Sequence, residues 1–280
     1  MPWAPNPWRV RKMASGFPRS FDVHVLLDDA PHYPGSIHDD VVARARGYKA
    51  ALIPGAFVYG HISRAAIAAW GVDWVERGAM SARFRKPVYN HDDITVGAGA
   101  LEDDGSFLRS AVSVRNGDGE EVATGWIALP HQPVAAPDLS TLELLPMPEV
   151  PPPVAAGALP VGAPLHGRDR ELTAEDYRAS LSAFAEQHPL YAEHGFVHSG
   201  MLMRTGMGEV NGGWKFPAAV VLVEAEAQHF RPVYPGQVIR TAGRIAETYE
   251  RKGKHYFVSD EVLLADGVPA ARFRRTQIYG

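Results

Sequence analysis

The sequence predicts an α+β protein built from two copies of one unit, each an antiparallel sheet wrapped around a central helix. Three observations favour this fold class. A proline-rich stretch over residues 131–164 separates two parts of similar length. Each part has a central helical pattern followed by several long strand-like runs, which differs from the alternating strands and helices of a dinucleotide-binding fold. Landmark residues in the two parts also keep a constant offset along the chain.

The composition of the 280-residue chain is that of a protein with a buried core, because 46% of its residues are hydrophobic and 21% are charged. Its net charge of −4 argues against a general nucleic-acid binder. The lack of cysteine excludes disulfides, zinc–thiolate sites and cysteine nucleophiles. No apolar run reaches the ~20 residues of a membrane helix, and residues 1–7 lack the apolar segment of a secretory signal. We therefore expect a cytoplasmic protein with no nucleic-acid or membrane partner.

The first part begins with a strand-like run over residues 21–27 and a short polar–apolar segment over 38–48. Small and apolar residues then recur at helical spacing over Gly55–Trp70, which predicts the first central helix. Strand-like runs follow, with a hairpin turn at residues 117–119. These runs cover residues 79–88, 94–101, 107–114 and 122–129.

The second part begins with a helix over residues 174–185, for which Thr173 is the expected N-cap and Asp176 completes an acidic capping box. A second helical stretch starts near Gly200. Strand-like runs are then expected over residues 218–230, 238–249, 255–264 and 270–279. Proline fixes φ and removes backbone donors, so the proline-rich stretch is expected to be an extended connector. We place the domains at residues 1–131 and 169–280, with the linker over 132–168.

The two parts align without a gap over their best landmarks. Gly55 opens the first central helix and Gly200 opens the second, and the two glycines are separated by 145 positions. The Pro-Val-Tyr tripeptides at residues 87–89 and 232–234 have the same offset. Because the landmarks agree in order and in spacing, we interpret the sequence as an internal duplication.

Several segments resemble the MaoC-like hydratase family. That family runs Asp-x-Asn-Pro-x-His-x-Asp, then a small helix that ends in Gly-Phe or Gly-Tyr, then a His-Gly pair at the start of a central helix. Here His38 lies on the motif histidine, Tyr48 closes the small helix ten residues later, and Gly55 lies on the helix-opening glycine. The Phe-x-x-Pro-Val segment over residues 84–88 is also typical of the family. An altered copy of the motif covers residues 186–200 in the second part.

This resemblance implies a tandem double hotdog fold in which an acyl-CoA or acyl-carrier thioester enters a tunnel between the two units. In the family, an aspartate and a histidine activate a water molecule that adds to the enoyl double bond. A backbone N–H at the start of the central helix stabilises the negative charge on the thioester oxygen. The resemblance implies no cofactor, and it implies that the two halves pair as two single hotdog units do. We also expect a further homodimer of the whole chain.

The chain departs from the family pattern at the acid–base pair. The position five residues before His38 holds Tyr33, which is not a base at neutral pH. In the second part Glu186 lies on the aspartate position and Tyr191 on the histidine position. One half thus keeps the imidazole and the other keeps a carboxylate.

Three functions are consistent with this departure. In a hydratase or dehydratase, Glu186 would act with His188 or His198 beside Gly200, while His38 and Gly55 mark the corresponding place in the first half. In a thioesterase-like hydrolase, one carboxylate would direct a water molecule to the thioester. As a non-catalytic binding protein, the third possibility, the chain would bind an acyl thioester or a partner subunit.

Structural roles compete with these assignments. His38 could be a surface cap at the start of a short helix, and His188 a C-terminal cap before Pro189. His61 and Ser63 on the first central helix are expected to be buried with satisfied hydrogen bonds. Basic residues beside the Pro-Val segments could contact CoA phosphates or lie as strand-surface charges. These basic residues are Arg85, Lys86 and Arg231. We predict no metal site, because no pair of candidate ligands has a convincing spacing.

Overall fold

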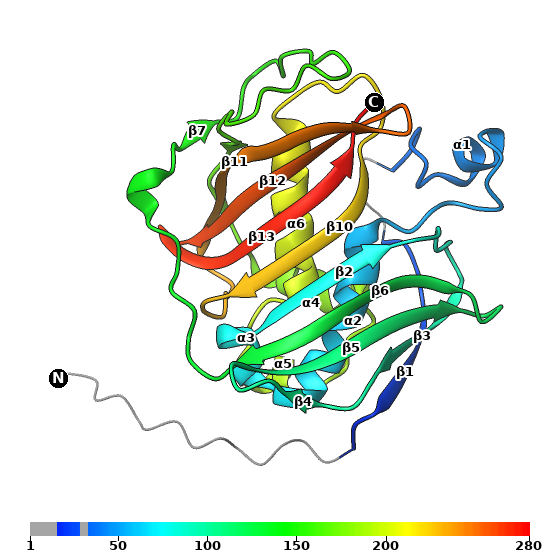
Figure 1. Cartoon of the computed structure of the whole chain (residues 1–280), viewed down its shortest axis with the longest axis vertical. Coiled ribbons are helices and arrows are strands. Elements are labelled where there is room, and N and C mark those ends of the chain that lie inside the picture. The colour runs from blue at the N-terminus through cyan, green and yellow to red at the C-terminus, as the bar shows by residue number, and fades with distance from the viewer. Residues whose placement is uncertain (1–15, 29–32) are drawn as a thin grey trace.

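One continuous antiparallel sheet curves around two long helices in the computed structural model, which describes residues 16–28 and 33–280 (Figure 1). The first half contains β1 (Arg19–His24), α1 (Asp40–Ala45), α2 (Gly55–Trp70), α3 (Val72–Arg77), β2 (Ala79–Phe84), β3 (Asp93–Ala98), β4 (Glu102–Asp103), β5 (Phe107–Asn116) and β6 (Glu121–Pro130). The second half contains β9 (Arg170–Glu171), α4 (Ala174–Ala183), α5 (Pro189–His194), α6 (Ser199–Gly212), β10 (Val221–His229), β11 (Val238–Arg251), β12 (Lys254–Ala265) and β13 (Val268–Ile278).

The two halves share this sheet through a single strand pair. Its order is β1-β3-β5-β6-β2-β10-β13-β12-β11-β9, with β4 paired to β5. At the junction β2 and β10 run antiparallel, and their register extends from Ala79↔Gln228 to Arg83↔Glu224. Each half therefore contributes a sheet around its own long helix, which confirms the predicted α+β duplication. The domain boundaries at residues 131 and 169 stay a prediction.

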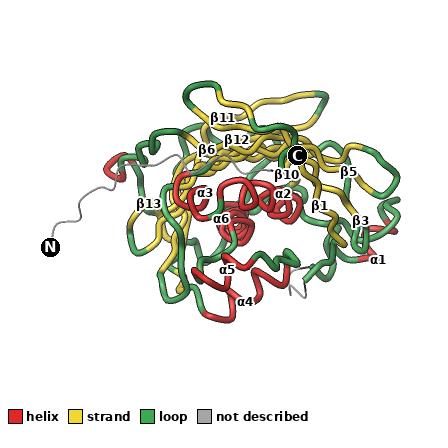
Figure 2. Tube along the Cα trace, turned by 90° about the horizontal axis from the view of Figure 1, so that it is seen from below, coloured by secondary structure: helices red, strands yellow, loops and turns green. Residues whose placement is uncertain are grey.

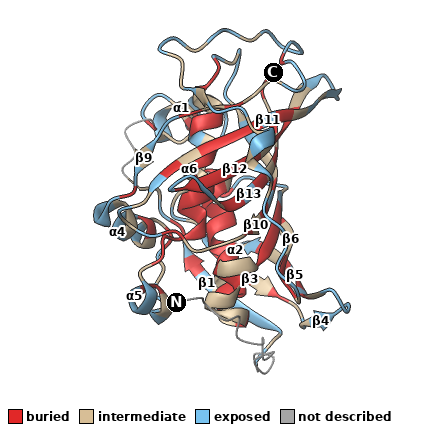
Figure 3. Cartoon of the chain, turned by 90° about the vertical axis from the view of Figure 1, so that its left-hand side faces the viewer, coloured by how far each residue is buried: buried red, intermediate tan, exposed pale blue. Residues whose placement is uncertain are grey.

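The central helices α2 and α6 lie side by side in the hollow of the sheet, and α4 and α5 cover the side away from the strands (Figure 2). Both are largely buried, as Figure 3 shows. They approach closely where each has a glycine: a Cβ atom on Gly200 would lie 2.8 Å from the Cα of Gly60. The predicted cap of α4 is confirmed, since Thr173 and Asp176 form a reciprocal capping box.

The interiors of the two halves differ in polarity. Buried strand residues of the first half carry no charge: most are apolar, for example Val96, Val114 and Ile127, and Ser81 and Ser110 are polar. In the second half, Glu261 on β12 and Arg275 on β13 are fully buried and form an ion pair beneath α6. Such a pair is tolerated only when further hydrogen bonds satisfy both groups.

The linker is ordered against the second half. It contains a 3₁₀ turn (Leu139–Thr141) and a parallel pair of short strands, β7 (Leu145–Pro146) and β8 (His166–Gly167). Near its end the linker pairs with β11: Gly162 N–H donates to the carbonyl of Ile245 at 2.8 Å, and Ile245 N–H donates to the carbonyl of Ala163 at 2.9 Å. The linker and β9 thus cover a sheet edge that would otherwise expose unpaired backbone groups.

No helix in the described ranges is both long enough and apolar enough to span a bilayer.

The buried His229 at the end of β10 is expected to make folding stability depend on pH. Its ring contacts Trp74 edge-on at 4.7 Å, and burial lowers its pKa from 6.5 to about 4. The unfolded chain therefore takes up the proton first as the pH falls. The stability contribution is complete above pH ~6.5 and is lost, by roughly 3 kcal/mol, as the pH falls to ~4.

The measurement is the unfolding free energy of the wild type and of His229→Leu at several values between pH 8 and pH 4. The variant is expected to lose less stability over this range. Comparing each protein with itself cancels any constant packing cost of the substitution. Equal pH dependence in the two proteins would contradict the prediction.

Candidate active site

Glu186 and His198 meet where the loop after α4 reaches the start of α6. The distance from Glu186 Oε2 to His198 Nε2 is 3.8 Å, and the exposed fractions of the two side chains are 4% and 0%. Sequence reasoning proposed Glu186 together with either His188 or His198. The structure brings Glu186 to His198, so this pair defines the candidate site.

His198 is the N-cap of α6, and its hydrogen bonds define its tautomer. The N–H of Gly200 donates to His198 Nδ1 at 3.1 Å, so this nitrogen carries no proton. The opposite nitrogen, Nε2, lies 3.4 Å from Ser63 Oγ, and the Ser63 hydroxyl itself donates to the carbonyl of Gly60 at 2.7 Å. Burial lowers the pKa of His198. The side chain is therefore a neutral imidazole with its proton on Nε2, facing Ser63 and Glu186.

Glu186 keeps one carboxylate oxygen free of hydrogen bonds. Its Oε1 accepts the backbone N–H groups of Gln187 and His188, each at 2.8 Å, whereas Oε2 is buried and has no hydrogen-bond partner among the described residues. Burial alone would raise the pKa of Glu186, but His198, the His188 N–H and the Arg64 charge together lower it to about 2. The carboxylate is therefore ionised at neutral pH, and its open lone pair can accept a proton from a nearby water molecule.

The first half of the chain also builds this site. Arg64 on α2 donates from Nη2 to the carbonyls of Phe184 and Ala185, and its Nε lies 4.0 Å from Glu186 Oε2. Ser63 comes from the same helix. A loop of the second half thus rests on the central helix of the first, and the site lies between the halves.

Aromatic rings enclose the imidazole. Phe184 stacks on His198 with ring centroids 4.3 Å apart and planes inclined by 13°, and Tyr191 stacks at 5.3 Å. Both residues are buried. Tyr191, which the alignment placed on the family's histidine, is held by its backbone, because its carbonyl accepts the Tyr177 hydroxyl at 2.6 Å.

His188 does not face the carboxylate with its ring. It is the N-cap of α5, and its Nδ1 accepts the N–H of Leu190 at 3.4 Å. The prediction that His188 is a C-terminal cap is therefore wrong, because His188 caps the start of a helix. The proline that follows it occupies the first position of α5, where no N–H is needed. His188 contributes its backbone N–H to Glu186.

The corresponding place in the first half holds different chemistry. His38 Nδ1 lies 2.7 Å from the carbonyl of Leu52, and its ring is 5.2 Å from that of Tyr33. Burial raises the pKa of Tyr33 further from neutrality. Close to Tyr33, Arg204 on α6 forms an ion pair with Asp28 at 2.5 Å. This half therefore has a tyrosine and an ion pair where the other has Glu186.

Two histidines of the first half differ in the structure from the structural roles that the sequence predicts. His38 does not cap the short helix α1, because the side chain of Asp39 does so. His61 is buried as expected, but neither ring nitrogen has a hydrogen-bond partner in the described part of the chain, and burial lowers its pKa to about 3. Gly55 begins α2 as predicted.

The three basic residues do not form one cluster. Arg85 and Lys86 follow β2 and form exposed ion pairs with Glu121 and Glu120, whereas Arg231 follows β10. The antiparallel register places these two segments at opposite ends of the junction, roughly 30 Å apart along the strands. Only Arg231 lies toward the start of α6, where Val197 N–H donates to the Val233 carbonyl at 2.7 Å.

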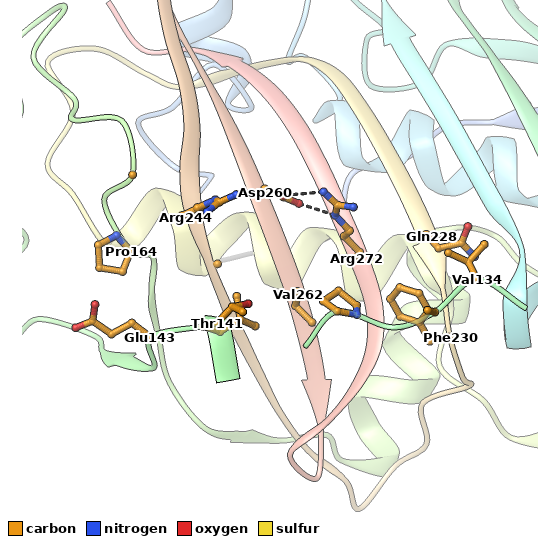
Figure 4. A pocket seen from close by; sticks show the side chains of 15 residues that line it. Val134, Thr141, Glu143, Pro164, Gln228, Phe230, Arg244, Asp260, Val262 and Arg272 are labelled. Carbon is orange, nitrogen blue, oxygen red and sulfur yellow. Dashed lines mark hydrogen bonds and ion pairs between the residues drawn. The ribbon is translucent and has the colours of Figure 1, made fainter. Parts of the chain in front are cut away.

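A pocket of about 590 Å³ lies elsewhere, between the linker and the outer face of the second half (Figure 4). Its lining includes Arg244 and an Asp260–Arg272 ion pair. None of the predicted site residues lines it. The described residues also contain no group of three or more potential metal ligands.

Sequence reasoning missed Arg64 and Phe184 and treated Ser63 as a structural residue. Ser63 and Arg64 lie more than 120 positions before Glu186, so no local motif connects them. The position of Ser63 and Arg64 on the central helix of the first half could have indicated them. A tunnel between two units must be lined by residues of both.

No family model and no curated protein matches this chain in sequence. Solved structures match it over nearly its whole length. A proposed MaoC domain dehydratase from Chloroflexus aurantiacus gives a TM-score of 0.64 at 14% identity, over 98% of this chain and 99% of its own. A conserved hypothetical protein from Mycobacterium tuberculosis, described as having a double hotdog fold, gives 0.61 at 15% identity, over 93% and 95%.

A MaoC-like dehydratase also gives a TM-score of 0.61, at 14% identity over 93% of this chain and 97% of its own. A Lactobacillus plantarum protein for which oleoyl thioesterase activity is proposed gives 0.51, at 9% identity over 93% and 95%. At these identities the likeness shows the fold, which is the double hotdog that the motifs predict. The same fold thus occurs in proteins named for two different reactions.

Proposed function

We propose that this double hotdog chain is a hydratase or dehydratase of acyl thioesters, in which Glu186 is the acid–base residue and His198 orients the reacting water. One observation carries the proposal: an ionised, buried carboxylate with a free oxygen lies 3.8 Å from the N–H side of a neutral imidazole at the start of a central helix. The motif resemblance and the fold of the MaoC-like dehydratase support the choice of reaction.

The proposed chemistry needs only one proton carrier. A water molecule donates a hydrogen bond to Glu186 Oε2 and accepts one from His198 Nε2–H. Its oxygen adds to the β-carbon of the enoyl thioester, its proton passes to Glu186, and the electron pair moves onto the thioester oxygen. The protonated Glu186 then returns the proton to the α-carbon. His198 orients the water but stays neutral throughout, because a neutral imidazole is too weak an acid to give up its remaining proton.

The start of α6 is suited to the developing negative charge. A helix N-terminus presents free N–H groups and the positive end of the helix dipole. The Gly200 N–H now donates to His198 Nδ1, so it must be shared with, or transferred to, the thioester oxygen during the reaction. A glycine permits the close approach that this requires.

Thioester hydrolysis is the second candidate, favoured by the single ionised carboxylate, which can direct water to a carbonyl carbon as readily as to an alkene carbon. The two reactions release different products. We would incubate the full chain with crotonyl-CoA and follow both the loss of enoyl absorbance and the appearance of free thiol. Loss of absorbance without thiol supports hydration. Thiol release supports hydrolysis, and neither product, with the ligand still bound, supports a non-catalytic binder.

Replacing His198 by asparagine should separate its two roles. Asparagine is a good N-cap, so His198→Asn can keep the bond to the Gly200 N–H while it removes the Nε2 donor. We expect hydration to fall about 10²-fold or more, and thermal unfolding shows whether the smaller side chain still leaves the protein folded.

The matched control is His188→Asn, the same substitution at the N-cap of α5. This control should retain activity within a few-fold. If both variants, or neither, lost activity, His198 would not have the proposed role.

A further inference from the structure

Phe184 fills the space between the two central helices at the candidate site. A Cβ atom on Gly60 would lie 2.2 Å from its ring, and a Cβ atom on Gly200 would lie 2.6 Å from it. The ring is fully buried and stacks on His198. Two glycines on different helices and one flat imidazole therefore form a slot, and the Phe184 ring occupies it.

This slot coincides with the place that the proposed reaction assigns to the substrate. The thioester oxygen must approach the N–H of Gly200, and the acyl carbons must lie beside Glu186 Oε2 and His198 Nε2. A thioester group is planar, as the phenyl ring is, so the two can occupy one flat slot in turn but not together.

The turn that carries Phe184 is strained, and several hydrogen bonds hold it, among them one from the Ala185 N–H to the Ser182 carbonyl at 3.0 Å. Ala185 has φ of +46°, a conformation that is costly for a residue with a Cβ. Arg64 anchors the turn through the Phe184 and Ala185 carbonyls, and Glu186 N–H donates to the carbonyl of Leu181 at 2.8 Å. Release of the turn would relieve the strain at Ala185, which lowers the cost of moving the ring.

We propose that Phe184 is a gate: its ring holds the slot between Gly60 and Gly200 until an acyl thioester displaces it by moving residues 184–185, while the N–H groups of Gln187 and His188 keep the Glu186 carboxylate in place. The inference rests on the proposed function for the identity of the ligand. It assigns to this site a closed state, in which Glu186 and His198 are shielded, and an open state, in which the thioester plane lies on the imidazole.

Two measurements test the gate, and both detect binding rather than turnover. The first is the dissociation constant of butyryl-CoA, which has no double bond to hydrate, for the wild type, Phe184→Ala and Phe184→Leu. If displacement of the ring reduces the apparent affinity of the wild type, Phe184→Ala should bind about 10-fold tighter or more, and Phe184→Leu should show a smaller gain.

The matched control is Phe196→Ala, which removes another buried ring near Tyr191 but not one from the slot. Affinity in this control should equal that of the wild type. Equal affinity of Phe184→Ala and wild type, or the same gain in Phe196→Ala, would overturn the gate.

The second measurement uses the unaltered protein, so it stands even if Phe184→Ala fails to fold. Amide hydrogen exchange is followed with and without butyryl-CoA. The amides of Phe184 and Ala185 should exchange faster when the ligand is bound, although bound ligands usually protect. Unchanged or slower exchange in this segment at saturating ligand would contradict the proposal. If both binding measurements support the gate but the protein does not hydrate crotonyl-CoA, the proposed reaction is disproved and the gate is not.

Discussion

Glu186→Gln is expected to lower the rate of enoyl-thioester hydration by 10² to 10⁴-fold, which is the usual contribution of a general base. The amide has nearly the shape of the carboxylate, and its oxygen can still accept the N–H groups of Gln187 and His188, which now bond to Oε1. What it loses is the ability to take a proton from water. Steady-state hydration of crotonyl-CoA measures the effect, and the dissociation constant of butyryl-CoA shows whether the site still binds.

The control for this variant is Glu193→Gln, the same change at an exposed position on α5. It should retain the wild-type rate. Turnover of Glu186→Gln within a few-fold of the wild type would exclude Glu186 as the base. A similar loss of butyryl-CoA affinity and of rate would assign Glu186 to binding instead.

Breaking the buried ion pair of the second half should have the largest effect on stability. Glu261 and Arg275 are fully buried. Arg275 Nε donates to Glu261 Oε1 at 2.8 Å, Arg275 Nη1 donates to the Met203 carbonyl at 2.9 Å, and the Ser259 hydroxyl donates to Glu261 at 2.5 Å. Glu261→Met should lower the unfolding free energy by about 3–5 kcal/mol, because it leaves the guanidinium charge buried without a partner.

The double variant Glu261→Met/Arg275→Met should be more stable than either single variant, since it removes both charges. Denaturant unfolding of the three variants completes a double-mutant cycle. A control pair lies on the same two strands: Arg272 and Asp260 form a more exposed ion pair, with exposed fractions of 46% and 18%. Asp260→Asn should cost no more than about 1 kcal/mol. A double variant less stable than both singles would contradict the argument.

Much of the fold could be predicted because it is repeated. The offset of 145 positions between Gly55 and Gly200, and the long strand-like runs after each helix, depend only on local pattern and spacing. The buried Glu261–Arg275 pair could not be predicted in this way. In sequence each residue stands in a strand-like run next to another residue of the same charge, and a charged side chain is normally assigned to the solvent face.

The candidate site was only partly predictable, for a related reason. Glu186 and His198 lie within one motif, so their type and spacing identified them. Ser63 and Arg64 reach the site from the other half, and only the packing of α2 against the 184–198 loop brings them there. The position of Phe184 depends on a side-chain orientation and on the turn at Ala185, which no spacing rule encodes.

The single strand pair between β2 and β10 has a consequence for how this molecule can change. In an assembly of two identical subunits, every substitution is made twice and must be tolerated in both environments. Here one polypeptide supplies both members of the pseudo-dimer, so each position is altered independently of its counterpart. Covalent fusion has thereby removed a symmetry constraint. Glu186 without a mirror-image carboxylate, and a charged interior beside an uncharged one, are the asymmetries that such freedom allows.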